Sequence, residues 1–139
     1  MDFKKRVENF LERQHFMRHI GFSLNVIEKG RTEGVMDVEQ IHYQQTGLVH
    51  GGVIATLADI TAGFAAYTMV PEDHHVVTGE IKISYLNPGK GNQLKSVGWV
   101  LKSGRKLQFC EAEVYDLRDE GEVLIAKASA SMVVLAPGR

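Results

Sequence analysis

The sequence predicts an α+β protein in which a curled antiparallel sheet of about six strands wraps around one long central helix. Residues 51–69 are apolar or small on every side of a helix, so other parts of the protein or lipid must enclose them. Most of the remaining chain consists of short runs in which apolar and polar residues alternate, as in half-buried strands. No linker, internal repeat or low-complexity tract divides the 139 residues, so we expect one domain spanning residues 1–139.

The first part of the chain predicts a helix followed by a hairpin. Residues 2–18 carry apolar side chains close to helical spacing with charges between them, which is typical of an amphipathic surface helix. Gly21 ends this segment, and residues 22–38 form two strand-like runs around Lys29-Gly30-Arg31, a plausible hairpin turn. Residues 40–49 are polar and without a period, so we interpret them as a loop. Three histidines are interpreted as surface or loop residues: His15, His19 and His42.

The central helix is expected at residues 51–69, between Gly51-Gly52 and Pro71. Its apolar part is about as long as a minimal membrane-spanning helix, at roughly 18 residues. Asp59 near its centre argues against a membrane, because a carboxylate at the middle of a bilayer costs roughly 2.5–3.5 kcal/mol. Gly63 and several threonines argue the same way, and strands of a globular domain flank the segment. We therefore predict that protein encloses this helix and that the chain does not associate with a membrane.

Four further strands are predicted after the helix, at residues 76–86, 93–102, 106–117 and 122–135. Short connections containing glycine follow the second and third of these strands, so they should form antiparallel hairpins. The inner face of the last strand is expected to carry Leu124 and then three alanines, which leave room for a helix to lie close to the sheet: Ala126, Ala128 and Ala130.

Composition excludes several functional classes. The formal net charge is -1 and no run of Lys or Arg is present, so no nucleic-acid partner is expected. Cys110 is the only cysteine, which excludes disulfide frameworks and cysteine-based zinc sites, and we interpret it as a small core residue. The N-terminus lacks the uninterrupted apolar core of a signal peptide, so the expected location is cytoplasmic.

The residues that enter the central helix suggest chemistry. Two adjacent glycines, Gly51 and Gly52, remove side chains where the first backbone N–H groups of the helix have no intrahelical partner. Such donors suit an oxygen that gains negative charge during acyl transfer, although a flexible entry turn is the alternative. Asp59 is either a structural core carboxylate or a functional acid, because an unpaired buried carboxylate is costly. No basic residue between Val53 and Val70 is available to pair with it.

The spacing of Gly51 and Asp59 constrains any shared role. They are eight residues apart, which corresponds to about 12 Å along a helix. That separation is too large for both to act on one carbonyl carbon, so a common reaction requires that they come from different chains. A two-fold homodimer with neighbouring antiparallel helices would provide two such composite sites.

One combination of motifs resembles a known family. Gln44-x-x-Gly47-x-x-His50-Gly51-Gly52, followed by Asp59 in an apolar helix, resembles the signature of hotdog-fold acyl-CoA thioesterases. The likeness is greatest to the PaaI-like and 4-hydroxybenzoyl-CoA thioesterase branch. It continues in Tyr85-Leu86-Asn87-Pro88 and Ser103-Gly104-Arg105, and it covers residues 20–135 approximately. The resemblance implies hydrolysis of an acyl-CoA thioester to a free acid and coenzyme A.

The resemblance also implies roles for individual residues. Asp59 matches the helix acid that acts as nucleophile or as general base on water. Gly51 matches the glycine whose N–H polarises the thioester carbonyl across a dimer interface. Gln44 matches a side chain that positions the carbonyl or the water, and His50 matches an orienting histidine. Thr78 falls near a position where some relatives hold the water with a hydroxyl group.

The strand pattern constrains Thr78. Alternation places it on the face of Glu80 and Lys82, opposite Ile81. Thr78 would therefore point into a site only at a strand end or through a β-bulge at Gly79.

For coenzyme A, the resemblance implies surface contacts near the loops of the sheet. Arg105 is the main candidate for a phosphate contact, since a guanidinium binds phosphate through two parallel hydrogen bonds; an ordinary turn charge is the alternative. Weaker candidates are Gly52, Asn87, Lys90, Gly104 and Lys106. Coenzyme A belongs to the substrate, so we expect no separate cofactor. We also expect no metal, because His74-His75 beside Asp73 lack a further ligand at recognisable spacing.

The resemblance also suggests a homotetramer, built as a dimer of dimers. Two alternative functions remain open on the same fold. One is a non-catalytic acyl-CoA sensor, although no DNA-binding segment accompanies the domain. The other is an enoyl-thioester dehydratase, which uses a different arrangement of Asp and His.

Overall fold

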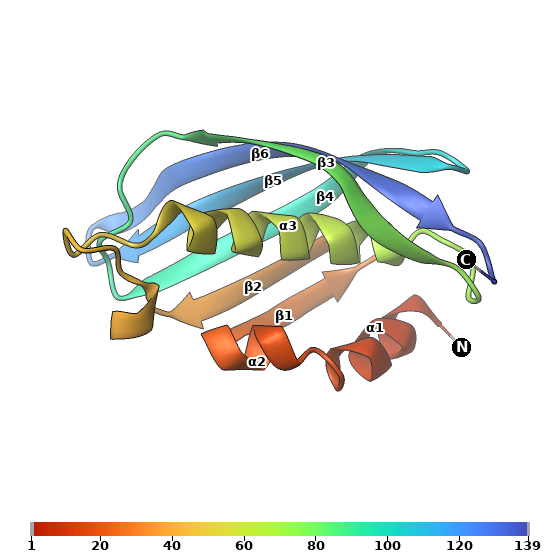
Figure 1. Ribbon diagram of the computed structural model, residues 1–139, viewed down its shortest axis with the longest axis horizontal. Helices are drawn as coiled ribbons and strands as arrows, with labels where there is room; N and C mark the ends of the chain where they lie inside the picture. The colour runs from red at the N-terminus through yellow and green to blue at the C-terminus, as the bar shows by residue number, and fades with distance from the viewer. Residues whose placement is uncertain (1, 139) are drawn as a thin grey trace.

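Six antiparallel strands within the described residues, 2–138, form one sheet in the order β1-β2-β4-β5-β6-β3. In this computed structural model the sheet curls around helix α3, as Figure 1 shows, which confirms the predicted α+β fold class. The helices are α1 (Phe3–Leu11), α2 (His15–Ile20), a 3-10 turn η1 (Gln40–His42) and α3 (Gly51–Tyr67). The strands are β1 (Phe22–Glu28), β2 (Arg31–Asp37), β3 (His75–Tyr85), β4 (Gln93–Ser103), β5 (Leu107–Arg118) and β6 (Gly121–Leu135).

Helix α3 approaches the sheet most closely at Gly98 of β4. A Cβ atom at Gly98 would lie 2.6 Å from the carbonyl oxygen of Thr61, so only glycine permits this approach. Buried hydroxyl groups fix the helix at the same place. Ser96 Oγ lies 2.8 Å from Thr61 Oγ1, and Thr32 Oγ1 donates to the Thr61 carbonyl at 2.8 Å. These satisfied polar contacts hold α3 at one position along the sheet.

The small-residue face of β6 is partly as predicted. Its three alanines are buried, and Met132 beyond them is fully buried. The prediction for Leu124 is wrong: the pairing of β5 with β6 shifts between Val114 and Tyr115, and Ile125 occupies the fully buried position instead. A β-bulge of this kind reverses which side chain of a strand points inward.

The N-terminal segment differs from the prediction of one helix over residues 2–18. It forms two helices, α1 and α2, and the guanidinium of Arg18 in α2 donates to the carbonyl groups of Leu11 and Glu12 at the end of α1. This contact joins α2 to the end of α1. Helix α2 then ends at Gly21, whose φ of 79° is the left-handed conformation that favours glycine.

The strand predictions hold elsewhere. The β1–β2 hairpin turns at Lys29-Gly30, and Gly30 has a φ of 78°. Strands β4, β5 and β6 form consecutive antiparallel hairpins, whereas β3 pairs with β6. Register between β3 and β6 shifts from Thr78 to Glu80, which places a bulge at Gly79.

One face of α3 is not enclosed by its own chain. Its half-buried residues include Val53, Asp59, Ile60, Gly63 and Tyr67, although the opposite face is fully buried. The expectation that protein surrounds this apolar helix is therefore met on the sheet side only. No helix in residues 2–138 is both long enough and apolar enough to cross a membrane.

Candidate active site

A tight loop precedes α3 and positions Gln44. The Gln44 N–H donates to the Leu48 carbonyl at 2.8 Å, and the Gly47 N–H donates to the Gln44 carbonyl at 3.1 Å. Gly47 has a φ of 81°, a conformation that glycine adopts without strain. The Gln44 side-chain oxygen accepts a hydrogen bond from the Thr46 hydroxyl at 2.8 Å. Loop geometry thus holds this side chain beside the beginning of the helix.

The two glycines at the beginning of α3 are not equivalent. His50 caps the helix, because its Nδ1 accepts a hydrogen bond from the Gly52 N–H at 3.0 Å. An accepting Nδ1 puts the ring proton of a neutral His50 on Nε2. The Gly51 N–H has no acceptor among the described residues. Gly51 therefore offers the free donor, at the end of the helix where the backbone dipole is positive.

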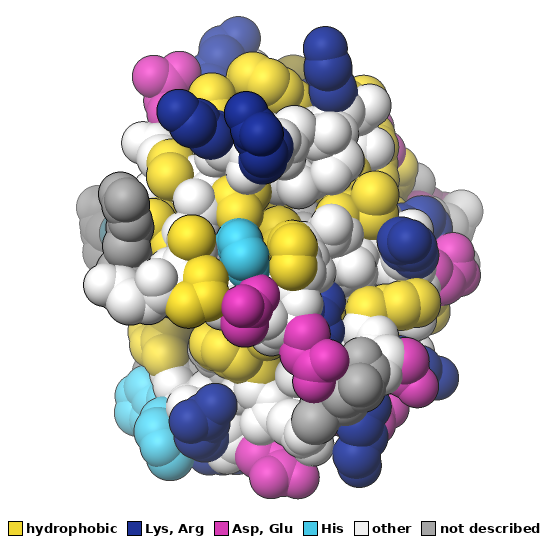
Figure 2. All heavy atoms as spheres, turned by 90° about the vertical axis from the view of Figure 1, so that its right-hand side faces the viewer, with side chains coloured by type: hydrophobic (Ala, Val, Ile, Leu, Met, Phe, Trp, Pro, Cys, Tyr) yellow, Lys and Arg dark blue, Asp and Glu magenta, His cyan; other side chains and the backbone are white. Residues whose placement is uncertain are grey.

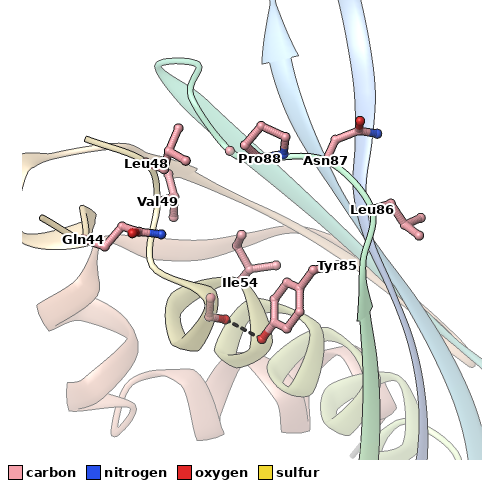
Figure 3. A pocket seen from close by; sticks show the side chains of 10 residues that line it. Gln44, Leu48, Val49, Ile54, Tyr85, Leu86, Asn87 and Pro88 are labelled. Atoms are coloured by element: carbon pink, nitrogen blue, oxygen red, sulfur yellow. Dashed lines mark hydrogen bonds between the residues drawn. The ribbon is translucent and has the colours of Figure 1, made fainter. Parts of the chain in front are cut away.

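A cavity of about 360 Å³ adjoins this donor (Figure 3). The Tyr85 hydroxyl donates to the Gly51 carbonyl at 2.8 Å, and the Tyr85 side chain comes within about 3.3 Å of where a Cβ at position 51 would stand. Tyr85 and Ile54 face the space between the loop and the helix. Two predicted site residues, Gln44 and Gly51, therefore line the same cavity, and Asn87 lines it from the loop after β3.

Asp59 lies on the open face of α3 and is held by Thr78. The Thr78 hydroxyl donates to Asp59 Oδ1 at 2.5 Å, a length typical of a hydrogen bond to a charged carboxylate. Thr78 can do so because of the bulge at Gly79, the condition that the strand pattern required. Thr78 is paired with Met132, whose side chain is fully buried on the inner face. Asp59 Oδ2 has no hydrogen-bond partner among the described residues.

Asp59 and Thr78 line a second cavity of about 260 Å³. This cavity shares no residue with the one beside Gly51. The two groups predicted to act on one thioester therefore occupy separate hollows of a single chain, in keeping with their separation of about 12 Å along the helix.

Apart from Gly52, whose N–H donates to His50, the candidate coenzyme A contacts form two groups. Gly104, Arg105 and Lys106 make the turn between β4 and β5, and a third cavity of about 540 Å³ joins the last two to His74. The Arg105 and Lys106 side chains are exposed and make no hydrogen bond or ion pair with another described residue. Figure 2 views this end of the molecule, where Lys and Arg side chains gather at the upper edge above hydrophobic side chains.

The other group, Asn87 and Lys90, follows β3. The Asn87 amide donates to the Leu124 carbonyl at 2.9 Å and points away from the cavity in Figure 3. The Lys90 N–H donates to the buried carboxylate of Asp116 at 2.9 Å, whereas Lys90 itself is exposed. Asn87 thus has a structural contact already, and the Lys90 ammonium stays in solvent.

The prediction that His42 is a surface or loop residue is wrong. His42 is 1% exposed; its Nδ1 accepts from the Glu39 N–H at 2.9 Å, so Nε2 donates to the Ile20 carbonyl at 2.7 Å. His42 therefore ties η1 to the end of α2. His74 Nδ1 lies 2.7 Å from a carboxylate oxygen of Asp73. Across residues 2–138, no group of three or more His, Cys, Asp or Glu side chains is arranged to hold a metal ion.

Some lining residues were not among the predicted site residues. Tyr85 was noted only as part of the motif Tyr85-Leu86-Asn87-Pro88. It has the same parity in the strand as Ile81 and Ile83, which indicates that its side chain points to the inner face of the sheet, and it lines the cavity beside Gly51. Phe10 and Gln14 of the N-terminal segment line the cavity beside Asp59. Nothing in an amphipathic pattern says which part of the protein a surface helix covers, so the sequence held no signal for them.

Comparison with known proteins agrees with this architecture. Residues 46–123 match the thioesterase superfamily. The medium/long-chain acyl-CoA thioesterase YigI of Salmonella typhimurium is 26% identical over 143 residues, covering 91% of this chain and 90% of the relative. A thioesterase family protein from Silicibacter pomeroyi has a crystal structure with a TM-score of 0.94 and 31% identity, covering 96% and 98% of the two chains. The E. coli PaaI protein shares the fold, with a TM-score of 0.85 at 16% identity over 97% and 94% of the two chains.

The chain belongs to the thioesterase superfamily and has the hotdog fold. It is an enzyme of the thioester hydrolase class, as the resemblance implied.

Proposed function

We propose that the protein hydrolyses an acyl-CoA thioester to a free acid and coenzyme A at sites shared between two copies of the chain. Asp59 of one copy acts as nucleophile or as general base on water. The Gly51 N–H of the other copy polarises the thioester carbonyl. One observation carries the proposal: Asp59, with its Thr78 hydrogen bond, and the free Gly51 donor line separate cavities of the same chain.

The edge of the sheet supports the two-chain arrangement. Strand β3 ends the sheet order and pairs with β6 alone among the described strands. It is 11 residues long, and Val77 on it is 47% exposed. A long open edge with apolar side chains favours pairing with a second copy. Pairing about a two-fold axis brings the open faces of two α3 helices together in opposite directions. Each Asp59 then lies beside the Gly51 end of the partner's α3.

Each half of the site has a defined chemical task. The Thr78 hydrogen bond fixes Asp59 Oδ1 and leaves Oδ2 to attack the carbonyl or to take a proton from water. Attack produces an oxyanion, which the Gly51 N–H and the positive end of the helix dipole stabilise. Gln44 lies in the same cavity as Gly51 and positions the carbonyl or the water, while His50 keeps the helix start in place.

The same dimer accounts for the two groups of coenzyme A candidates. Arg105 and Lys106 share a cavity with His74, next to His75 of the cavity beside Asp59, whereas Asn87 lines the cavity beside Gly51. When two chains pair in opposite directions, the Arg105 end of one copy lies beside the Asn87 end of the other. Nucleotide phosphates would then contact Arg105 and Lys106 of one copy near the loop of Asn87 and Lys90 of its partner.

Further parts of the proposal follow from the family. We expect a homotetramer assembled as a dimer of dimers, a cytoplasmic location, and turnover without a metal or separate cofactor. The acyl-CoA substrate of the YigI relative supports coenzyme A as the thiol of the substrate.

Turnover of an acyl-CoA panel, followed with a thiol reagent, tests the proposal. Wild type is compared with Asp59→Asn and Asp59→Ala, and Asp73→Asn is the matched control because Asp73 is an exposed carboxylate outside the cavity beside Asp59. We expect both Asp59 variants to lose turnover and the control to keep it. Undiminished activity in both Asp59 variants would remove this acid from the mechanism, and binding without turnover by wild type would indicate a sensor.

A further inference from the structure

We propose that the cavity beside Asp59 holds the acyl group of the thioester and that Phe10 of α1 closes it, which makes Phe10 a specificity-determining residue. This inference rests on the proposed function, because it takes Asp59 as the group at the thioester carbonyl. The lining comes from three elements, α1 with its following turn, α3 and β3: Phe10, Gln14, Asp59, Ile60, Gly63, Phe64, Tyr67, His75, Val76, Val77 and Thr78.

The cavity leads away from Asp59 along the helix. Its α3 residues recur at intervals of one turn, from Asp59 through Gly63 to Tyr67, a path of about 12 Å. Strand β3 runs beside the helix in the opposite direction, because Tyr85 contacts Gly51 and Thr78 contacts Asp59. Its first residues therefore lie beside the later turns of α3. We call this space the acyl groove.

Aromatic rings close the end of the acyl groove that is remote from the acid. The Phe10 ring packs edge-on against Tyr67, with centroids 5.2 Å apart, and against Phe64, with centroids 6.3 Å apart. Phe64 and Tyr67 also pack edge-on at 6.4 Å. Phe10 is the member of this cluster that comes from outside α3, so its size alone can change the length of the groove without altering the helix.

Helix α1 is anchored firmly enough to act as a wall. Arg6, which is 7% exposed, donates through Nη2 to the carbonyl groups of Tyr67 and Val70 at 3.2 and 3.0 Å. The Tyr67 carbonyl belongs to the last residue of α3 and the Val70 carbonyl lies just beyond it, at the helix end where a cation is favoured. Val7 on the next position is fully buried in the core. The position of Phe10 is therefore fixed relative to Asp59.

The chemistry of the lining suits an apolar acyl group better than the pantetheine arm. Pantetheine carries two amides, which lose their hydrogen bonds to water unless the protein replaces them. Most of the acyl groove is hydrocarbon, and Gly63 leaves space where another residue would project a side chain. The cavity beside Gly51 instead offers the Gln44 side chain and the Tyr85 hydroxyl. A groove of about 12 Å closed by aromatic rings takes a compact acyl group, aromatic or of medium chain length.

Chain-length profiles of Phe10 variants test the assignment. Phe10→Ala lengthens the acyl groove and Phe10→Trp shortens it. Phe16→Ala is the matched control, since Phe16 is 58% exposed on α2 and does not line the groove. We expect Phe10→Ala to raise the ratio of kcat/KM for dodecanoyl-CoA over that for hexanoyl-CoA by about tenfold or more. One additional methylene in an apolar pocket already changes kcat/KM by about tenfold. Phe10→Trp should lower the same ratio, and Phe16→Ala should leave it unchanged.

Binding of non-hydrolysable S-alkyl-CoA thioethers, measured by calorimetry, separates the two proposals. The same order of chain lengths in wild type and in both Phe10 variants would overturn the acyl groove, as would a Phe10 effect on free coenzyme A alone. Thermal unfolding identifies a variant that does not fold, and the other Phe10 variant then decides. If thioether binding depends on Phe10 while wild type hydrolyses no acyl-CoA, the proposed hydrolysis fails and the groove stands.

Discussion

Removal of the Thr78 hydroxyl is the sharpest perturbation of the Asp59 half of the site. Thr78→Val keeps the shape of the side chain and deletes the 2.5 Å hydrogen bond to Asp59 Oδ1. A hydrogen bond to a charged group contributes about 1.5–3 kcal/mol. Since each 1.36 kcal/mol corresponds to a factor of ten in rate, loss of an oriented carboxylate should lower kcat about 10- to 100-fold. Thr78 is exposed in the single chain, so the lower part of this range is expected unless a partner covers it.

Steady-state hydrolysis of an acyl-CoA provides the assay. Thr78→Ser should restore most of kcat, because it returns the hydroxyl, while KM stays close to that of wild type in both variants. Ser129→Ala is the control, since it deletes an exposed hydroxyl on the outer face of β6. An unchanged kcat in Thr78→Val, or a loss that Thr78→Ser does not reverse, would refute a positioning role for this hydrogen bond.

Three further predictions concern the scaffold. Gly98→Ala should destabilise the protein by roughly 1–3 kcal/mol in urea, because the added Cβ would lie 2.6 Å from the Thr61 carbonyl oxygen; an unchanged midpoint would contradict the close helix–sheet contact. Burial raises the pKa of the Cys110 thiol to about 12, so folded protein at pH 8 should resist a thiol reagent and react only once unfolded. Arg6→Met should cost about 1–3 kcal/mol by removing two hydrogen bonds to the end of α3, and equal stability would show that those bonds contribute nothing.

Elements that depend on neighbouring residues could be predicted from the sequence. The apolar run from Gly51 predicted α3, and the alternation of apolar and polar residues predicted the strands. Glycine marked the turns at Gly21 and Gly30, where φ is positive in the structure. Each of these signals reflects the backbone conformation or the periodicity of a few neighbouring residues. A single sequence is therefore enough to reveal them.

Side-chain contacts between separate elements escaped prediction. The N-terminal segment divides into α1 and α2, and Arg18 of α2 donates to the carbonyl groups of Leu11 and Glu12. Burial of His42 depends on a hydrogen bond to Ile20, 22 residues away. An amphipathic or polar stretch looks the same whatever it covers, so tertiary structure decided both.

The candidate site divides in the same way. Motif spacing brought Gln44, Gly51 and Asp59 to attention, and the helical rise indicated that the last two cannot meet within one chain. The orientation of Thr78 depends on a register shift at Gly79. Alternation alone would have placed the Thr78 side chain on the opposite face of β3. Phe10 gave no signal, because its role comes from where α1 packs.

Mixing two inactive variants tests the shared site most directly. Gly51→Pro deletes the proposed donor while the first helical position tolerates proline, and the extended conformation of His50, with φ -61° and ψ 136°, suits a residue before proline. Asp59→Asn deletes the acid. Each variant alone should be inactive. Co-refolded in equal amounts, half of the dimers become mixed, and one of the two sites in each receives an intact Asp59 and an intact Gly51. We expect the mixture to recover about a quarter of wild-type activity. No recovery from a mixture shown to contain mixed dimers would contradict it.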